Sequence, residues 1–203
     1  MSLVIVGAGG HGREVLDVVE ASGLPFLGFV DDGSPDVEPL TRRAATLLGG
    51  VAEIEGLDVA VLLGLGDSRV RRRVGEALLG CRWSRAVVHP LASTGTDVEL
   101  GAGTVLCAGA RLTTHITVGL HGYVGPNATI GHDATLADYV TVLPGATVSG
   151  NVHLAVGASI GTGANVRQGV RVGEGAVVGA GAVVIADVEA GTTVVGVPAR
   201  PRA

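Results

Sequence analysis

The fold is decided by residues 128–160, which read ATIGHDATLADYVTVLPGATVSGNVHLAVGASI. An aliphatic residue recurs at every sixth position of this stretch, and a small or β-branched residue stands two places before each of them. The pattern continues in both directions without a miss, through Leu100, Leu106, Leu112, Val118, Val124, Ile130, Leu136, Val142, Val148, Leu154, Ile160, Val166, Val172, Val178 and Val184.

A period of six predicts a stack of short strands joined by corners. The apolar face of a helix recurs at three and four residues, and a plain alternating strand recurs at two, so neither explains the period. Hexapeptide repeats are typical of a parallel β-helix, in which each coil buries its face only against its neighbours. With three repeats per triangular coil, we expect about five coils over residues 91–190, followed by a tail over residues 191–203.

The composition narrows the class of protein. The chain has 203 residues and a net charge of -5, which argues against nucleic acid or an anionic membrane as a partner. It contains no lysine, so arginine is the only side-chain cation available for a phosphate. It shows neither a signal-peptide pattern nor an apolar run long enough to cross a membrane, and we expect a cytoplasmic protein.

Residues 1–90 follow a different pattern. Residues 3–6 form a short apolar run, residues 7–12 are glycine-rich, and residues 13–19 have helical spacing. Further apolar runs cover residues 26–30 and 59–64, and an arginine-rich helix is expected from Arg69. This alternation predicts a βαβαβ unit with a parallel sheet, that is, half of a Rossmann fold.

The glycine-rich loop matches the G-x-G-x-x-G fingerprint, in which glycines let a phosphate approach the amide-rich start of a helix. Only one mononucleotide-binding half precedes the repeats, so we expect a nucleotide-sugar site rather than a dinucleotide site. A nicotinamide-type cofactor and a turn without a ligand remain as alternatives. The predicted contacts are Gly7, Gly9, Gly10, His11, Gly12, Asp31, Asp32 and Gly64.

His132 is the candidate catalytic residue of the repeats. It follows the inward Ile130 by two places and is therefore expected at an exposed corner, where a histidine near neutrality suits a general base. Asp133 could orient the ring and stabilise its cation. One full coil further along the chain, Gly150 should stack against His132 and offer a bare N–H to an oxyanion. The alternative is a solvated corner histidine beside a corner glycine.

Together, these motifs resemble the NeuD/PglD-type sugar acyltransferases of bacterial glycan biosynthesis. The resemblance rests on the glycine loop, the hexapeptides, the Gly-His-Asp corner at residues 131–133, and residues 149–152 and 195–200. It implies a left-handed β-helix, acetyl-CoA as donor without a metal, and a nucleotide-linked amino sugar or a sialic acid as acceptor. It also implies that His132 is the base, Asp133 its acidic neighbour, and Gly150 a ligand of the thioester carbonyl.

The coenzyme is expected along the β-helix. The predicted acetyl-CoA contacts are Thr141, Gly150, Gly161, Thr162 and Arg200, with Arg167 and Arg171 as further candidates for its phosphates. Because one β-helix has flat faces, we expect a homotrimer with the site between neighbours.

Two departures from the family pattern leave the choice between an amine and a hydroxyl acceptor open. Some N-acetyltransferases of the family carry a second histidine where this chain has Thr141, and some carry an asparagine where it has Gly125. O-acetylation of sialic acid or another hydroxyl sugar is therefore the alternative within this class.

Two other classes of function remain as rivals. Four histidines lie in the repeats, as in a β-helical zinc hydratase, but histidines on successive corners diverge within one chain. A non-catalytic protein that binds a nucleotide sugar is the second rival. The histidines concerned are His115, His121, His132 and His153.

Overall fold

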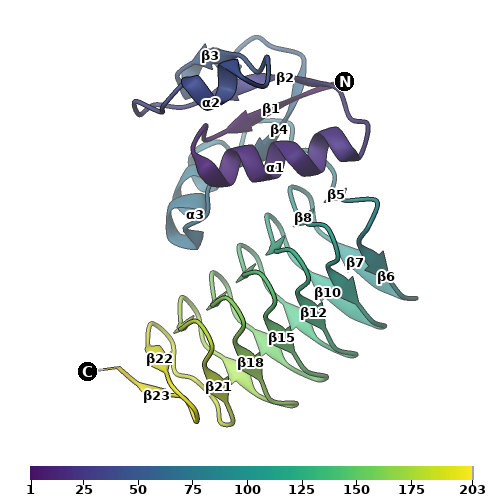
Figure 1. Ribbon diagram of the computed structural model, residues 1–203, viewed down its shortest axis with the longest axis vertical. Helices are drawn as coiled ribbons and strands as arrows, with labels where there is room; N and C mark the ends of the chain where they lie inside the picture. Colours follow the sequence, from purple (N-terminus) through teal and green to yellow (C-terminus); the bar gives the residue numbers. More distant parts are fainter. Residues whose placement is uncertain (203) are drawn as a thin grey trace.

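The computed structural model describes residues 1–202, and it places a small α/β unit at one end of a triangular β-helix (Figure 1). The α/β unit contains a parallel sheet in the order β3-β2-β1-β4. Its elements are β1 (Ser2–Val6), α1 (Gly10–Ala21), β2 (Phe26–Val30), α2 (Glu38–Thr41), β3 (Leu47–Gly49), the 3-10 helix η1 (Val51–Ile54), β4 (Val59–Leu63) and α3 (Ser68–Ala77).

Two apolar clusters hold this sheet. On one face, Ile5 and Leu62 pack against Leu16 of α1, and all three are fully buried. On the other face, Val4 and Val61 pack toward η1 and α3. A parallel sheet covered on both faces explains the nearly continuous apolar runs in the sequence. The predicted βαβ unit is confirmed.

The β-helix consists of three parallel sheets, here called face B, face C and face D. Face B holds β5 (Val87–Val88), β8 (Val105–Leu106), β11 (Tyr123–Val124), β14 (Thr141–Val142), β17 (Ser159–Ile160), β20 (Val177–Val178) and β22 (Thr193–Val195), with β23 (Arg200–Pro201) antiparallel at its end. Face C holds β6 (Ser93–Thr94), β9 (Arg111–Leu112), β12 (Thr129–Ile130), β15 (Thr147–Val148), β18 (Asn165–Val166) and β21 (Val183–Val184). Face D holds β7 (Val98–Leu100), β10 (Ile116–Val118), β13 (Thr135–Leu136), β16 (His153–Leu154) and β19 (Arg171–Val172).

The six-residue period describes the interior correctly. From Leu106 to Val184 every aliphatic residue of the series is buried, and Leu100 at the first coil is partly buried. Each strand pairs with the strand one coil away on the same face, as in Thr129 with Thr147 and Ile130 with Val148. The stack begins earlier than predicted, at Val87, and continues into β22, so the left-handed β-helix is about one turn longer than expected.

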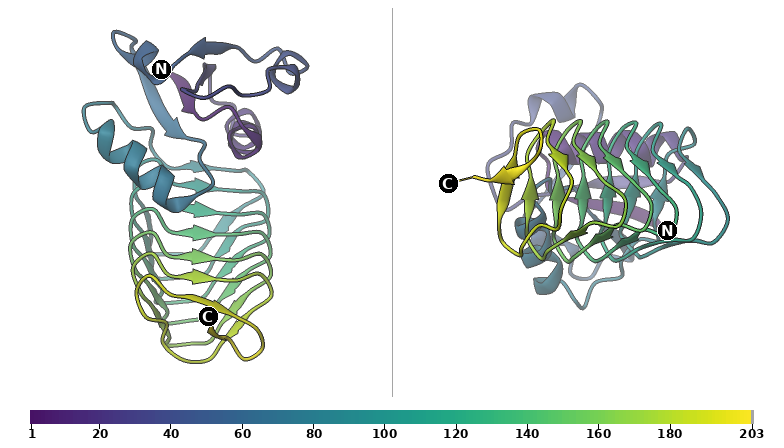
Figure 2. Two further views of the ribbon diagram at one scale, coloured as in Figure 1. Left: turned by 90° about the vertical axis from the view of Figure 1, so that its left-hand side faces the viewer. Right: turned by 90° about the horizontal axis from the view of Figure 1, so that it is seen from below.

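A buried arginine lies at the contact between the two parts. Helix α3 lies beside the β-helix (Figure 2), and its Arg71, which is 2% exposed, reaches the corner between faces D and B. Arg71 donates to the carbonyl oxygens of His121 at 3.1 Å and Tyr139 at 2.9 Å, and to Thr141 Oγ1 at 2.7 Å. Ser68 Oγ adds a bond to a carbonyl oxygen of a later coil at 2.8 Å. These contacts fix the α/β unit against face B.

The arginine has only neutral acceptors. Burial lowers the pKa of Arg71 to about 10, while the nearby Asp67 carboxylate opposes that shift. Burial and the charge of Arg71 lower the pKa of the adjacent His121, which is 2% exposed, to about 4. A cation in such a place depends on its hydrogen bonds, because removing one partner leaves buried polar groups uncompensated.

No helix within residues 1–202 is long and apolar enough to cross a bilayer.

Replacing Arg71 with methionine should destabilise the protein by about 3 kcal/mol or more, because several buried carbonyl oxygens lose their donor. The measurement is the free energy of unfolding in urea, together with hydrogen exchange of the α3 amides. Arg73→Met is the matched control: Arg73 is exposed on the same helix. Its effect should stay within about 0.5 kcal/mol. Equal effects of the two substitutions would contradict a clamping role for Arg71.

Candidate active site

The structure places His132 at the corner between faces C and D. The residue follows β12 and precedes β13, and 52% of its side chain is exposed. The chain turns there through Asp133, which has a φ of 61° in the left-handed region that Asp tolerates better than most residues. The predicted exposed corner is therefore confirmed.

Asp133 orients the His132 ring. Its Oδ2 lies 2.6 Å from His132 Nδ1. An ionised carboxylate only accepts hydrogen bonds, so Nδ1 carries the proton and the neutral ring keeps its lone pair on Nε2. Hydrogen bonds from two histidines lower the pKa of Asp133, which keeps the carboxylate ionised. The pair thus presents a free basic nitrogen toward solvent.

Gly150 lies directly against the imidazole, as the spacing of one coil predicts. A Cβ at this position would be 2.6 Å from both Cε1 and Nε2 of His132. Any side chain would therefore displace the ring. Within residues 1–202 the Gly150 N–H has no hydrogen-bond acceptor, so it remains available to a ligand.

His115 is a member of this site that the sequence analysis considered only as a zinc ligand. Its Nδ1 lies 2.7 Å from Asp133 Oδ1, so the two oxygens of one carboxylate contact two imidazoles. This hydrogen bond raises the pKa of His115. The signal was present in the sequence, because His115 precedes Asp133 by one full coil, the same spacing that separates His132 from Gly150.

The glycine loop forms a second site, at the carboxyl end of the parallel sheet. A Cβ on Gly12 would be 1.9 Å from the carbonyl oxygen of Gly7, and one on Gly64 would be 2.7 Å from the Cα of Gly12. These three glycines therefore allow strand and helix to approach closely. Gly9 and Gly10 instead face open space, with nothing closer than 3.9 Å to a Cβ at either position. The first turn of α1 has no side-chain cap and no acidic residue. Its backbone N–H groups are therefore open to an anion, and no negative side chain in that turn repels one.

Asp31 supports this loop, whereas Asp32 holds the start of η1. Asp31 accepts from the N–H of Ala8 at 2.8 Å and from the N–H of Gly33 at 2.8 Å. Asp32 accepts from the N–H of Val51 at 2.7 Å. Both carboxylates thus have structural partners, and each oxygen that accepts one hydrogen bond retains a second lone pair for a ligand.

His11 connects the glycine loop with face B. Its ring centroid lies 4.4 Å from that of Tyr123 in β11. Burial and the charge of Arg71 lower the pKa of His11 to about 4, so the ring is neutral at pH 7. The Tyr123 hydroxyl beside it is buried and has no hydrogen-bond partner within residues 1–202.

The predicted coenzyme contacts are dispersed over the β-helix. Gly150 lies at the corner of faces C and D, Gly161 and Thr162 lie at the corner of faces B and C, and Arg200 is exposed in β23. Thr141 requires a correction: it is 1% exposed, and its hydroxyl accepts from Arg71 at 2.7 Å. A coenzyme cannot reach Thr141 past α3. The other two candidates, Arg167 and Arg171, are exposed.

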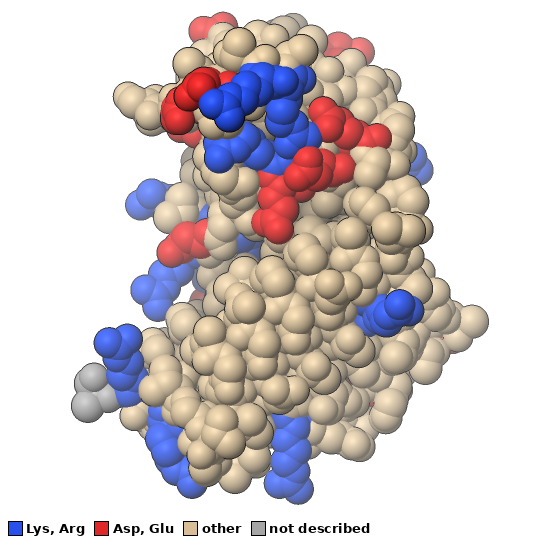
Figure 3. Space-filling view, viewed as in Figure 1, with Lys and Arg blue, Asp and Glu red and all other residues tan. Residues whose placement is uncertain are grey.

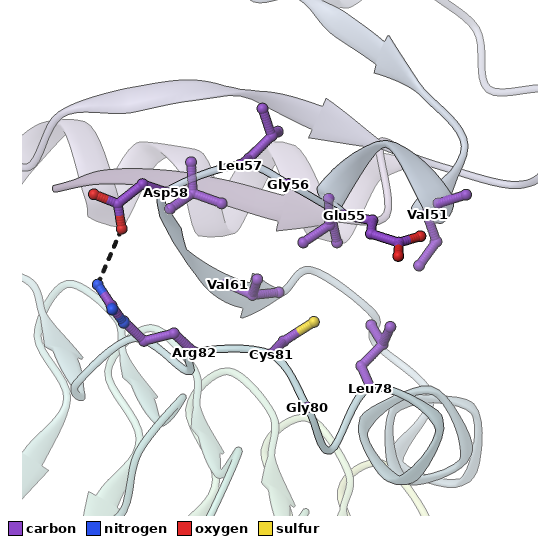
Figure 4. Close-up of a pocket in the computed structure, with 13 residues that line it drawn as sticks. Val51, Glu55, Gly56, Leu57, Asp58, Val61, Leu78, Gly80, Cys81 and Arg82 are labelled. Atoms are coloured by element: carbon purple, nitrogen blue, oxygen red, sulfur yellow. Dashed lines mark hydrogen bonds and ion pairs between the residues drawn. The ribbon is translucent and has the colours of Figure 1, made fainter.

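A groove of about 380 Å³ runs over face B below the start of α3. Arg69 lies at its rim and Ser159 and Gly161 line its floor. A larger cavity of about 610 Å³ lies in the α/β unit, where Val61, Leu78 and Cys81 line it and Arg82 donates to Asp58 at 3.1 Å (Figure 4). It contains none of the predicted site residues, so we place the chemistry elsewhere.

The two candidate sites lie on opposite sides of the same prism. His11 packs on face B, whereas His132 lies at the corner where faces C and D meet. In a triangular coil that corner is the one opposite face B. Within one chain the glycine loop and His132 are therefore on different sides of the β-helix. Within residues 1–202, no three His, Cys, Asp or Glu side chains are placed to hold a metal ion.

Comparison with known proteins assigns the family. Residues 2–78 match the PglD N-terminal domain. The acetyltransferase domain of PglB from Neisseria gonorrhoeae FA1090, solved in complex with acetyl coenzyme A, is 31% identical, with 99% of this chain and 98% of that chain covered and a TM-score of 0.89. The chain belongs to the NeuD/PglD-type sugar acetyltransferases.

Two further proteins similar to this chain agree with the family assignment. UDP-N-acetylbacillosamine N-acetyltransferase from Bacillus subtilis is 34% identical over 111 residues, which are 53% of this chain and 51% of that enzyme. The match therefore spans about half of that relative's length. PerB from Caulobacter crescentus, solved with CoA and GDP-perosamine, has a TM-score of 0.90 and 26% identity, with 100% of this chain and 98% of that chain covered.

The Gly150→Ala substitution should lower acetyl transfer by about 100-fold, because the new methyl group displaces the His132 ring and crowds the free N–H. The measurement is the steady-state rate of thiol release from acetyl-CoA. Gly80→Ala is the matched control, since a Cβ at Gly80 meets nothing within 4 Å and its φ is not in the left-handed region. Wild-type rates for Gly150→Ala would refute the role of this contact.

Proposed function

We propose that this chain transfers an acetyl group from acetyl-CoA to the amino group of a nucleotide-linked amino sugar, with His132 as the general base. The observation that carries the proposal is the His132 ring, oriented by Asp133 at 2.6 Å and lying against the bare backbone of Gly150. The product would serve bacterial glycan biosynthesis, as the resemblance of the family implies.

The acceptor would bind at the glycine loop. The uncapped start of α1 offers free N–H groups and a positive helix end to the diphosphate, with Gly9 and Gly10 leaving room for it. Asp31 would accept a hydrogen bond from the ribose or base, and Asp32 could do the same. Neutral His11 lies between this loop and face B and would contact the sugar.

The coenzyme would occupy the groove on face B. Gly161 and Ser159 form a floor without large side chains, and Arg69 at the rim provides a cation for a phosphate. Thr162 and Arg200 lie further along the same side of the β-helix, where an extended pantetheine arm and the nucleotide of CoA would reach them.

A neighbouring subunit would complete the site. The acceptor loop and the groove are both on face B, whereas the base lies at the opposite corner. In a homotrimer the C–D corner of one subunit can face the B side of the next, which brings His132 to the acceptor. The flank of the β-helix seen in Figure 3 carries few charged side chains, which favours packing between subunits.

The reaction proposed is a direct transfer. The acceptor amine attacks the thioester carbonyl carbon, and Nε2 of His132 takes the proton that the amine loses. The negative oxygen that forms would be bound by the Gly150 N–H. When the C–S bond breaks, the thiolate leaves and receives the proton from the His132 cation, which is stabilised meanwhile by Asp133.

The test supplies acetyl-CoA and a panel of UDP-, GDP- and dTDP-linked 3-amino and 4-amino sugars and follows thiol release. We expect at least one amino sugar to respond, and His132→Asn to lower kcat by about 1,000-fold while the acceptor still binds. Thiol release only with sialic acid or another hydroxyl sugar would contradict N-acetylation. Full activity of His132→Asn would contradict the role of the base.

A further inference from the structure

The carboxylate of Asp133 is shared by two histidines on successive coils. Its Oδ1 lies 2.7 Å from His115 Nδ1 and its Oδ2 lies 2.6 Å from His132 Nδ1. We propose that His115 is a positioning residue, which holds Asp133 in place and couples its own protonation to that of the base His132. This inference rests on the proposed function of His132.

The backbone sets up the sharing. His115 and Asp133 both occupy left-handed corner positions, with φ of 54° and 61°. The N–H of Asp133 donates to the carbonyl of Thr114 at 3.1 Å, and the N–H of Asn151 donates to that of His132 at 2.8 Å. Parallel stacking therefore places the side chain of residue 115 over that of residue 133, independently of their chemistry.

Each ring must donate its Nδ1–H to the same anion. An ionised carboxylate accepts only, so both neutral rings keep their lone pair on Nε2. With both oxygens engaged, Asp133 has no freedom to rotate away from His132. A carboxylate held from both sides keeps the base in one orientation at an otherwise exposed corner.

The sharing also couples the charges of the two rings. The hydrogen bond to Asp133 and the nearby Asp97 carboxylate on the preceding coil raise the pKa of His115. When His115 takes up a proton, its positive charge offsets the negative charge of the Asp133 carboxylate. The same positive charge opposes the addition of a proton to Nε2 of His132. Asp97, Asp133 and His132 are the charged and titratable groups that face His115, and Asn151 on the next coil is uncharged.

The consequence concerns the pH range of the enzyme. With His115 present, the Asp133 carboxylate is divided between two rings and does not serve His132 alone. Because all three side chains are open to water, the coupling is modest. Removing His115 should therefore move the acidic limb of the pH profile upward by about half a pH unit.

The experiment is an NMR titration of histidine-labelled full-length protein. His115→Asn is the informative variant, because asparagine tolerates the left-handed backbone at this corner. We expect the titration midpoint of the His132 ring to rise by about half a unit in His115→Asn, and the acidic limb of kcat/KM to move with it. In an Asp133→Asn background the same substitution should shift the midpoint by less than half as much.

His153→Gln is the matched control, because it removes another histidine of the same β-helix that makes no hydrogen bond to Asp133. It should leave the His132 midpoint unchanged. An unchanged or lowered midpoint in His115→Asn, or an equal shift in the control, would overturn the inference. The titration needs no turnover, so coupled rings without acetyl transfer would contradict the proposed function while sustaining the coupling.

Discussion

The architecture depends on the successive coils between Val87 and Val184 containing the same number of residues. Each parallel ladder pairs a residue with its counterpart one coil away, as between Thr129 and Thr147, and each inward aliphatic side chain is buried only by its counterparts on adjacent coils. One inserted residue would turn the following inward positions to the outside. The same regularity brings His115 over Asp133 and His132 over Gly150. The repeat that forms the core therefore also sets the position of the candidate base His132.

The triangular cross-section imposes the second constraint. Because Arg71 fixes the α/β unit onto face B, the glycine loop can serve only ligands on that side of the prism. His132 lies at the corner between the other two faces. The two halves of the proposed reaction are thus separated by the apolar interior of one chain, which is why we propose that they meet across a subunit boundary.

The features that follow from periodicity were predictable from the sequence, and those that depend on long side chains were not. The six-residue period predicted the buried positions and the contact of Gly150 with His132. The glycine motif predicted the close approach of strand and helix at residues 7–12. Thr141 was predicted to bind the coenzyme on the resemblance to the family motif, which does not show the arginine that covers it. Arg71 itself lies in a run of arginines, and only its spacing from Ser68 and Gly75 on one helix face marks it as buried.

The claim that two subunits share each site can be tested by mixing two inactive variants. Gly9→Asp should preserve the fold, because aspartate is a favoured N-cap, yet its charge would repel a diphosphate at the start of α1. His132→Asn lacks the base but retains the loop. If sites form between subunits, reannealed equimolar mixtures should recover about a quarter of wild-type acetyl transfer, since that share of interfaces pairs an intact loop with an intact base. A mixture as inactive as its parents, with subunit exchange verified by mass spectrometry, would contradict the account.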